Sequence, residues 1–537
     1  MKQKTVRNAI QMRLFIALIL LSALQSCISK DDMDFSKMAG SEWNPNFSVP
    51  LIHSKLDIGK ILNVNDSMSS VLDSLSSVTL VYKGDIYSIY GYQFLPLVDQ
   101  TNSHSINLTP TDITTLTTND SVTVGRNITY PFGVANGEHI DSMILGQGVL
   151  KIDISSTIRQ SGVLTITLPS VSINGIPYSK QVPFTYSNQL PLIATGNFNL
   201  DGCDFSMTTG GAFNAFPIQY SVKFYNSANP TLTSETFSVD ASFQNMVIKR
   251  VYGDFGLRNI PMTEDSTCIP IFYNANFGNI AFDDPKLKFS ITNSYGVRMD
   301  AHFTSMYAQS NMNGNTAITG APNPVLVQTP SSPGTSAASG FTLNKANSNI
   351  KTAINTNPQF IGYRLSAAFN PRTSYTDYIE DSSRFYADVS VELPLSGVAQ
   401  DLVIQDTVDF ALGDIKEIEW AKFRINTSNG FPLDANTQLY FVDTAYTVLD
   451  SLISSNEAII RAGIVDPSTG IVNHPTEKIT DEYFPMTRLR NIYNAKKIIV
   501  RSLMNSPGSS SQPVKFYPDY ILDVRLAAQV QLKINVQ

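Results

Sequence analysis

The sequence has few of the residues that build disulfide frameworks and metal sites. Its 537 residues include three cysteines, two tryptophans and five histidines. So few cysteines exclude a disulfide-rich scaffold. The histidines show no His-x-x-x-His or Glu-x-x-His spacing, so the sequence predicts no metal site. After the N-terminal region only Cys203 and Cys268 remain, and they either pair or stay as two buried free thiols.

Local catalytic and cofactor motifs are missing as well. The chain has no Gly-x-Ser-x-Gly elbow, no phosphate-binding glycine loop and no dinucleotide fingerprint. We therefore predict that the protein is not an enzyme and needs no cofactor. The carboxylates of a glycoside hydrolase come from distant strands and leave no local spacing. A surface glycoside hydrolase thus stays open as a further hypothesis.

The charge distribution argues against nucleic acid as a ligand. The chain has a formal net charge of −7, and the part after residue 26 keeps 34 basic against 45 acidic side chains. No basic tract interrupts this acidic chain, and nucleic-acid binding normally needs one. An apolar content of 42% is enough for packed cores, so we expect a globular protein.

The N-terminal segment 1–26 has the organisation of a signal peptide. Four cations, the last of them Arg13, precede an apolar run, Leu14–Leu24, which is shorter than the roughly 20 residues that a bilayer span needs. Leu24, Ser26 and Cys27 then resemble the lipobox of bacterial lipoproteins. In that family the cysteine is acylated and becomes the first mature residue, so the resemblance implies lipidation of Cys27. An ordinary cleaved secretory signal is the alternative.

The residues after Cys27 bear on where the anchored protein lies. Lys30, Asp31 and Asp32 resemble the lysine-plus-two-acids export signal of surface lipoproteins in the Bacteroidota. The resemblance implies an outer-membrane protein that is lipid-anchored and exposed at the cell surface. Two or more acyl chains are needed for stable anchoring. The alternative is an acidic linker on an anchor that faces the periplasm.

Short alternating runs of β-branched and aromatic residues dominate the rest of the chain. Turn residues separate them about every ten positions, a spacing typical of antiparallel sandwiches and barrels. We therefore predict an all-β fold of tandem antiparallel β-sandwich modules, with one or two short helices, of which one covers 486–497.

An internal repeat supports the modular reading. Residues 288–301 align without gaps on 422–435, at an offset of 134, and each copy reads as a strand, a glycine-bearing turn and a return strand. A fainter third copy, 151–154, lies a comparable distance upstream and begins at Lys151 as the first copy begins at Lys288. Spacings near 135 have the size of a whole sandwich. The turns resemble those of immunoglobulin-like modules in uncharacterised Bacteroidota lipoproteins, which implies a fold and no functional residue.

The repeat and the composition together predict a serial domain order. Residues 309–345 are poor in charge and rich in Asn, Thr, Ser, Gly and Pro, which indicates a linker or surface loop, or a partner-binding loop that orders on contact. The predicted order is a signal peptide over 1–26, a tether over 27–45, sandwich modules over 46–200 and 201–308, the uncharged segment over 309–345, and a sandwich module over 346–537.

Aromatic residues in one predicted strand, 86–95, are candidates for ligand binding. Tyr90, Tyr92 and Phe94 alternate on one face of that strand, with Tyr87 on the other. An exposed aromatic ladder stacks on sugar rings, although the same pattern also arises from cross-strand packing within a sheet. We therefore take Tyr87, Tyr90 and Tyr92 as candidate ligand-binding residues.

Three hypotheses follow. The first is a non-catalytic surface lipoprotein that is a binding or scaffolding component of an outer-membrane complex, with an outer-membrane barrel or another lipoprotein as its partner. The second is a glycan-binding lipoprotein for nutrient capture, and the third is the hydrolase. The chain is expected to contact the membrane through its lipid alone, and to bind no nucleic acid.

Overall fold

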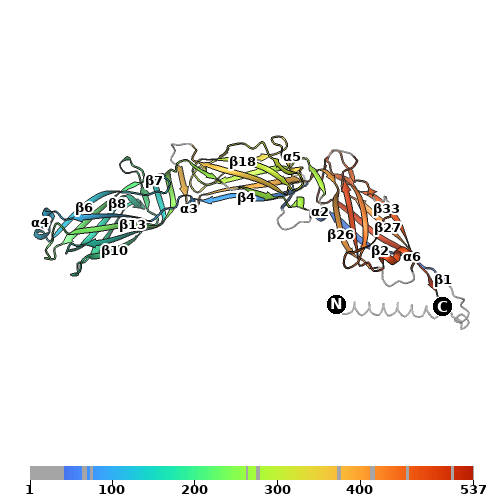
Figure 1. The fold of residues 1–537 in the computed structure, drawn as a ribbon, viewed down its shortest axis with the longest axis horizontal. Helices are drawn as coiled ribbons and strands as arrows, with labels where there is room; N and C mark the ends of the chain where they lie inside the picture. Colours follow the sequence, from blue (N-terminus) through green and yellow to red (C-terminus); the bar gives the residue numbers. More distant parts are fainter. Residues whose placement is uncertain are drawn as a thin grey trace, which may run out of the picture. The chain divides into compact units, whose positions relative to one another are not determined.

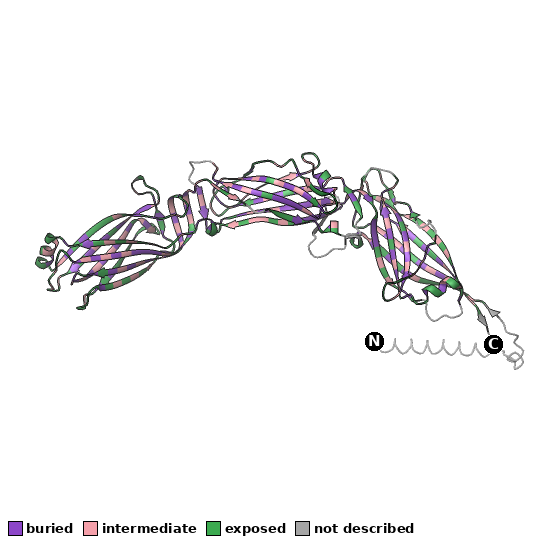
Figure 2. Ribbon diagram, viewed as in Figure 1, coloured by how far each residue is buried: buried purple, intermediate pink, exposed green. Residues whose placement is uncertain are grey.

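The computed structural model describes residues 42–535 except 63–68, 73–76, 262–263, 274–277, 372–376, 412–417, 455–458 and 509–512. Its described part is mainly β-strand, in antiparallel sheets with a few short helices, which confirms the predicted all-β class. Three sandwiches are present, and each is named here by its first strand (Figure 1). Buried and exposed residues alternate along the strands, as expected where one sheet face meets a core (Figure 2).

The β5 sandwich has two four-stranded sheets joined by one short strand. The first sheet has the order β5 (Gln100–Asn107), β13 (Thr236–Asp254), β7 (His139–Ser156) and β10 (Leu192–Asn199). The second has the order β6 (Ser121–Pro131), β12 (Ala215–Tyr225), β8 (Ser161–Ile173) and β9 (Ile176–Phe184). The strand β11 (Asp204–Ser206) bridges β7 and β8, and the helices are α4 (Pro110–Thr118) and the 3-10 turn Thr209–Gly211.

The β4 sandwich follows the same plan. Its first sheet has the order β4 (Val78–Tyr90), β24 (Arg384–Pro394), β17 (Lys286–Asn293) and β21 (Ala337–Leu343). In its second sheet, β14 (Arg258–Pro261) and β15 (Asp265–Cys268) pair with β22 (Phe360–Phe369), and β22 pairs with β18 (Met299–Ser310), which also pairs with β19 (Gly314–Ala317) and β20 (Val325–Val327).

Smaller elements complete the unit that the β4 and β5 sandwiches form. They are β3 (Ser69–Leu72), α3 (Gly91–Phe94), the 3-10 turn Pro270–Tyr273, β16 (Asn279–Phe282), α5 (Ile350–Ile354), β23 (Asp377–Glu380), β25 (Ser396–Gln400) and β35 (Val514–Lys515). The strand β23 pairs with β13. The first sheet of the β5 sandwich therefore includes a strand from a later part of the chain, more than 120 residues after β13.

The β2 sandwich is a compact unit of its own, made of residues 42–60, 403–507 and 520–535. Its first sheet has the order β2 (Asn46–Asp57), β36 (Ile521–Leu532), β27 (Ile418–Asn429) and β33 (Thr476–Pro485). Its second has the order β26 (Leu402–Asp409), β34 (Lys497–Asn505) and β28 (Asp434–Val442), and β28 also pairs with β29 (Val448–Ser451) and β30 (Ile459–Ile460). The remaining elements are β1 (Glu42–Trp43), α2 (Ile58–Leu62), β31 (Ile464–Val465), β32 (Val472–His474), α6 (Met486–Ile492) and β37 (Ile534–Asn535).

All three sandwiches have the same strand order. Numbered along its own chain, each has strands 1, 8, 3 and 6 in one sheet and 2, 7, 4 and 5 in the other. Eight strands in two such Greek keys form a double-sheet jelly roll. The sandwich architecture is therefore as predicted, whereas the strand order differs from the seven-stranded immunoglobulin arrangement that the turn resemblance implied.

The sandwiches are nested along the chain, which differs from the predicted serial domains. The chain first forms strand β2 of the β2 sandwich and then strand β4 of the β4 sandwich. It next forms the whole β5 sandwich. Only afterwards does it form the remaining large strands of the β4 sandwich and then those of the β2 sandwich. The predicted boundary at residue 200 separates β12 from its neighbours β6 and β8. The boundary at residue 345 separates β17 from β24. Pairings between strands hundreds of residues apart leave no local trace in the sequence, so composition could not reveal the nesting.

The uncharged segment 309–345 is part of the β4 sandwich, and the prediction of a separate linker is wrong for the residues that form strands there. Its β21 pairs along its length with β17, and Phe341 stacks on Phe289 with ring centroids 5.0 Å apart. Low charge fits strands and turns that satisfy their polar groups within the sheet. The helix predicted over 486–497 is present as α6, which ends at Ile492.

The sequence repeat is the turn between the third and fourth strands. Asn293 ends β17 and Asn429 ends β27, and both side chains are fully buried. Each side-chain oxygen accepts a hydrogen bond from the backbone N–H two residues later, at 2.9 Å from Tyr295 and 3.0 Å from Phe431. Each side-chain amide donates to two backbone carbonyls, those of Tyr295 and Gln328 in one sandwich and of Leu433 and Arg461 in the other.

These asparagines set the true register of the repeat. The ungapped alignment paired Asn293 with Thr427, two positions before its structural equivalent Asn429. In the β5 sandwich the buried Ser156 ends β7, and its hydroxyl accepts a hydrogen bond from the N–H of Ile158 at 3.0 Å. Aligning Lys151 with Lys288 places Ser156 on Asn293. The alignment of the third copy, 151–154, on the copy that begins at Lys288 therefore matches the structure. The alignment of 288–301 on 422–435 differs from the structural equivalence by two residues.

Aromatic side chains fill the three cores. In the β5 sandwich the buried rings of Phe205, Phe216 and Phe243 meet edge to face, with Phe216 and Phe243 centroids 5.5 Å apart. Truncating such a ring to alanine costs about 3–5 kcal/mol. In the β2 sandwich Phe423 and Phe484 make a similar pair at 4.8 Å. These cores leave the outer faces of the sheets free to vary, and the candidate sites lie there.

Candidate functional site

The predicted lipidation and export residues, Cys27, Lys30, Asp31 and Asp32, lie outside the described residues. The first described element, β1, pairs with β37 near the C-terminus. None of the described helices is both long and apolar enough to cross a bilayer.

Tyr90 and Tyr92 lie on the outside of the β4 sandwich, whereas Tyr87 lies on the inner face of β4, paired with the buried Ala387. The predicted strand over 86–95 ends at Tyr90, where α3 begins. As a result Phe94 turns into the core, where its ring lies 4.1 Å from that of Phe369. Tyr87 is half-buried and its ring lies 6.3 Å from that of Phe385, and this burial raises the pKa of its hydroxyl. Of the predicted set, only Tyr90 and Tyr92 are exposed together.

Tyr90 and Tyr92 form a stack that an arginine extends. Their ring centroids lie 5.7 Å apart with an interplanar angle of 21°, and 36% of Tyr90 and 57% of Tyr92 is exposed. The guanidinium of Arg384 lies 5.2 Å from the Tyr90 ring and 4.7 Å from the Tyr386 ring. Its Nε donates to the Ser88 hydroxyl at 3.0 Å, which fixes its plane.

The far end of this row is polar. The hydroxyl of Tyr386 donates a hydrogen bond to Asp85, and this bond raises the pKa of Tyr386 to about 12. We call Tyr92, Tyr90, Arg384 and Tyr386 the aromatic row. A row of exposed π faces beside hydrogen-bonding groups is suited to the apolar faces and hydroxyls of sugars. The sequence pointed to its tyrosines from β4 and α3, whereas Arg384 and Tyr386 come from β24, in the return part of the chain, and could not be linked to them.

A second surface feature lies on the β2 sandwich and was missed from the sequence. A hollow of about 680 Å³ opens on the outer face of its first sheet, with Ala527 of β36 between Arg424 of β27 and the β2 residues Pro50 and Leu51. The register of β2 against β36 shifts between Pro50 and Ile52, so Leu51 is an extra residue in a bulge. We call this feature the arginine hollow, and it is also lined by His53, Asn426 and Arg525.

Two aspartates hold the arginines of the hollow. Arg424 donates from Nε and Nη2 to the two carboxylate oxygens of Asp481, both at 2.7 Å, and Lys422 lies 2.7 Å from the same group. Hydrogen bonds from Arg424 hold the pKa of Asp481 well below its usual value. Arg525 donates in the same way to Asp523, at 3.1 and 3.2 Å. No local sequence signal could reveal the first pair, because 57 residues separate Arg424 from Asp481.

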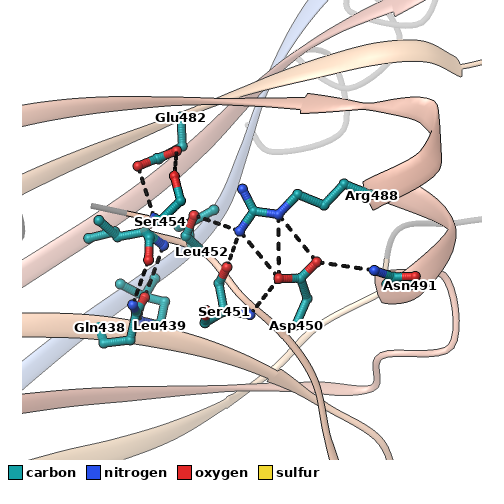
Figure 3. Close-up of polar contacts among 10 residues, drawn as sticks. Gln438, Leu439, Asp450, Ser451, Leu452, Ser454, Glu482, Arg488 and Asn491 are labelled. Carbon is teal, nitrogen blue, oxygen red and sulfur yellow. Dashed lines mark hydrogen bonds and ion pairs between the residues drawn. The ribbon is translucent and has the colours of Figure 1, made fainter. Parts of the chain in front are cut away.

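The densest network of partly buried polar groups has a structural role (Figure 3). Arg488 of α6 lies 3.7 Å above the ring of Phe484, is paired with Asp450, and donates to the carbonyls of Ser451 and Leu452. Nearby, Glu482 accepts hydrogen bonds from the backbone and hydroxyl of Ser454. These contacts tie α6 to the strand β29.

Metal and thiol chemistry have little support among the described residues. No three His, Cys, Asp or Glu side chains come close enough there to hold a metal ion. Cys203 and Cys268 are both free, with Cys203 buried and Cys268 exposed, so they do not pair. Burial raises the pKa of the Cys203 thiol to about 11.

No protein-family model matches the chain, and no curated protein matches its sequence. Among solved structures it is similar to a candidate secreted protein from Parabacteroides distasonis ATCC 8503, at 10% identity and a TM-score of 0.17, over 65% of this chain and 99% of that one. It is also similar to infectious bursal disease virus Gx strain, at 8% identity and a TM-score of 0.14, over 86% and 83% of the two chains. Sulfolobus turreted icosahedral virus gives 12% identity and a TM-score of 0.10, over 80% and 97%. At these TM-scores the similarities carry no argument about fold or function.

Proposed function

We propose that this protein is a non-catalytic lipoprotein of the outer membrane, exposed at the cell surface, that acts as a binding or scaffolding component of a membrane protein complex. The observation that carries the proposal is the nesting of the chain. Both ends of the described chain lie in the β2 sandwich unit, where β2 pairs with β36. A lipid on Cys27 would therefore tether the β2 sandwich, through a segment that precedes β1.

The nesting also gives the other two sandwiches a natural role in display. In the described chain the β5 sandwich lies between β4 and the remaining strands of the β4 sandwich, and the chain passes four times between the β2 unit and the unit that contains the other two sandwiches. Several chain segments, and not a single linker, would therefore connect the tethered β2 sandwich to the other two sandwiches. This arrangement suits a protein that presents binding modules to an outer-membrane barrel or another lipoprotein.

The anchor is tested by mass analysis of the mature N-terminus. We expect the first peptide to begin at Cys27 and to carry the mass of acyl chains, and a Cys27→Ser variant to leave the membrane fraction. An unmodified N-terminal residue in membrane-associated wild-type protein would contradict the proposal.

The partner is tested by crosslinking on intact cells, followed by purification from detergent-solubilised outer membranes. We expect a membrane protein or lipoprotein to be recovered with the chain in constant ratio. Recovery of the chain alone, at full yield, would contradict a role in a complex. A turnover screen on polysaccharides addresses the non-catalytic part, and release of reducing ends by the purified protein would contradict it.

The aromatic row supports a second candidate function, the binding of glycans for nutrient capture. The row offers the exposed rings of Tyr90 and Tyr92, with Arg384 placed between the rings of Tyr90 and Tyr386, as a surface on which sugar rings can stack. Affinity electrophoresis on neutral polysaccharides is the test. Retardation should fall in Tyr90→Ala and Tyr92→Ala variants. A complete lack of retardation, or retardation that both variants retain, would exclude this function.

A further inference from the structure

We propose that the arginine hollow of the β2 sandwich binds the carboxylate of an acidic saccharide, with Arg424 and Arg525 as the recognition residues. This site is separate from the aromatic row and from the lipid anchor, so it goes beyond both proposed functions.

The hollow is an open depression with the size of a small-ligand site. Its volume of about 680 Å³ lies within the roughly 300–1,000 Å³ typical of ligand pockets. The small side chain of Ala527 forms its floor, directly opposite Arg424 in the β27 ladder and Pro50 in the β2 ladder. Arg525 is opposite Asn426, so the two arginines are diagonal neighbours across β27 and β36. A ligand that entered the hollow would have a guanidinium on two sides and the apolar Pro50–Leu51 bulge on a third.

The arginines are held in place before any ligand arrives. Each is bound through Nε and Nη2 to one aspartate, which leaves the Nη1 group of each without a hydrogen bond among the described residues. The side chains stay accessible, with 57% of Arg424 and 62% of Arg525 exposed. A guanidinium that already has a fixed plane loses little conformational entropy when it donates to a carboxylate.

The charge around the hollow favours an anion. The described residues that line the hollow include Arg424 and Arg525 and no acidic side chain, while Asp481, Asp523 and Glu477 lie around these arginines, with Lys422 beside Asp481. A lining with two arginines and no acid is a local exception on an acidic chain, and guanidinium groups attract acidic ligands most strongly at low ionic strength.

Neighbouring groups favour a saccharide over other acids. Trp420 and Tyr483 pack on each other on the same outer face, with ring centroids 5.5 Å apart, and 56% of Tyr483 is exposed. Trp420 precedes Arg424 by four residues on β27, a distance of about 13 Å along a strand. The Asn426 amide, which lines the hollow, can bind hydroxyls. A polymer with acidic groups and flat apolar ring faces would contact the hollow and the aromatic pair together.

Affinity electrophoresis of the full mature chain in gels with polygalacturonate tests the proposal. Wild-type protein should be retarded, and the double variant Arg424→Gln, Arg525→Gln should lose about tenfold or more in affinity, because two charged hydrogen-bond donors are removed. Asp481 keeps Lys422 as a partner in that variant, and Asp523 keeps His53. A double Arg→Lys variant should also weaken binding, since lysine keeps the charge but lacks the planar set of N–H donors with which a guanidinium binds both oxygens of a carboxylate.

Controls separate this site from general charge and from other ligands. Lys288→Gln in the β4 sandwich, at the position equivalent to Arg424, should leave retardation unchanged, and so should Tyr90→Ala. The fully methyl-esterified polymer should retard the protein much less than the acid form. Unchanged affinity in a folded Arg424→Gln, Arg525→Gln variant would overturn the proposal. Equal retardation by polyglutamate, or binding to phosphatidylglycerol vesicles that the double variant loses, would overturn it in favour of a peptide or a membrane surface. None of these results bears on the lipid anchor.

Discussion

The β2 and β4 sandwiches share a buried turn and a strand order, but the side chains on their outer sheet faces differ. Both bury an asparagine that closes the turn after the third strand, and both present a depression on the outer face of the first sheet. Five residues before the asparagine, the β2 sandwich has Arg424 where the β4 sandwich has Lys288. On the neighbouring strand, Arg424 is paired with Ala527 of β36, and Lys288 is paired with Ser390 of β24.

The next outward position along β36 and β24 has side chains of opposite charge in the two sandwiches. The β2 sandwich has Arg525 where the β4 sandwich has Asp388, and the β4 depression of about 440 Å³ mixes Lys83, Lys286 and Lys288 with Asp388 and Glu392. Interior positions repeat because packing and buried hydrogen bonds allow few alternatives. Outward positions carry no such constraint, so the two sandwiches can differ there without loss of the fold.

The largest expected effect tests the shared interior. Asn429→Ala removes three hydrogen bonds in a fully buried turn and leaves two carbonyls and an N–H without their partner. We expect a loss of about 3–5 kcal/mol in the stability of the β2 sandwich. Asn293→Ala should cost the β4 sandwich a similar amount. Calorimetry should show each substitution lowering the transition of its own unit. A loss below about 1 kcal/mol in either, no more than one ordinary hydrogen bond, would break the equivalence of the two turns.

The second effect concerns pH, where two aspartates, Asp377 and Asp481, should contribute to stability in opposite directions. Burial, reinforced by Asp254 and opposed by Arg298, raises the pKa of Asp377 to about 6. Because the folded pKa lies above the unfolded value, ionising Asp377 costs stability as the pH rises from about 4 to 7. That cost is about 2 kcal/mol. Asp481 in the β2 sandwich has a lowered pKa, so its stabilising contribution is present above pH 4 and is lost as the pH falls further.

Chemical denaturation at several pH values checks the buried acid. Asp377→Asn should be more stable than wild type at pH 7, and the difference should shrink towards pH 4. Asp481→Asn should lose stability at pH 7 and match wild type at low pH. A wild-type advantage over Asp377→Asn that grows with pH would contradict the assignment of the raised pKa.

The third effect separates the two outer faces by ligand. Substituting Tyr90 and Tyr92 with alanine should reduce retardation by neutral polysaccharides about tenfold while leaving polygalacturonate binding intact, because stacking on the aromatic row is lost. Substituting Arg424 and Arg525 with glutamine should do the reverse. Affinity electrophoresis on paired gels measures both. If either variant affected both ligands equally, the two faces would not be independent sites.

The smallest expected effect is a transfer of specificity. Asp388→Arg, Ser390→Ala and Lys288→Arg together give the β4 depression the residues of the arginine hollow. Burial and the neighbouring Asp85 raise the pKa of Asp388, which means that its ionised carboxylate is unfavourable there. Replacing Asp388 with arginine removes that cost. We expect a few-fold gain in polygalacturonate affinity over an Arg424→Gln, Arg525→Gln background. No gain would mean that the Pro50–Leu51 bulge, and not the charges alone, shapes the site.

Particular residues show how far the sequence could lead. Alternation of apolar and polar residues predicted the all-β fold. The repeat was found, yet its register was two residues off because Asn429 and Asn293 are not aligned when gaps are forbidden. Tyr90 and Tyr92 were identified as exposed candidates, whereas Phe94 was misplaced because α3 interrupts the strand. Arg384 and Asp481 gain their roles from pairings between strands far apart in the chain, which no local pattern records.

The claim on which the functional account rests, display at the cell surface, can be measured through Cys268. This thiol is exposed and free, Cys203 is fully buried, and the thiol of Cys27 would be blocked by lipid. A membrane-impermeant maleimide added to intact cells should therefore label the protein once, and Cys268→Ser should abolish the label. Labelling that appears only after the cells are broken would place the protein inside the outer membrane and contradict the account.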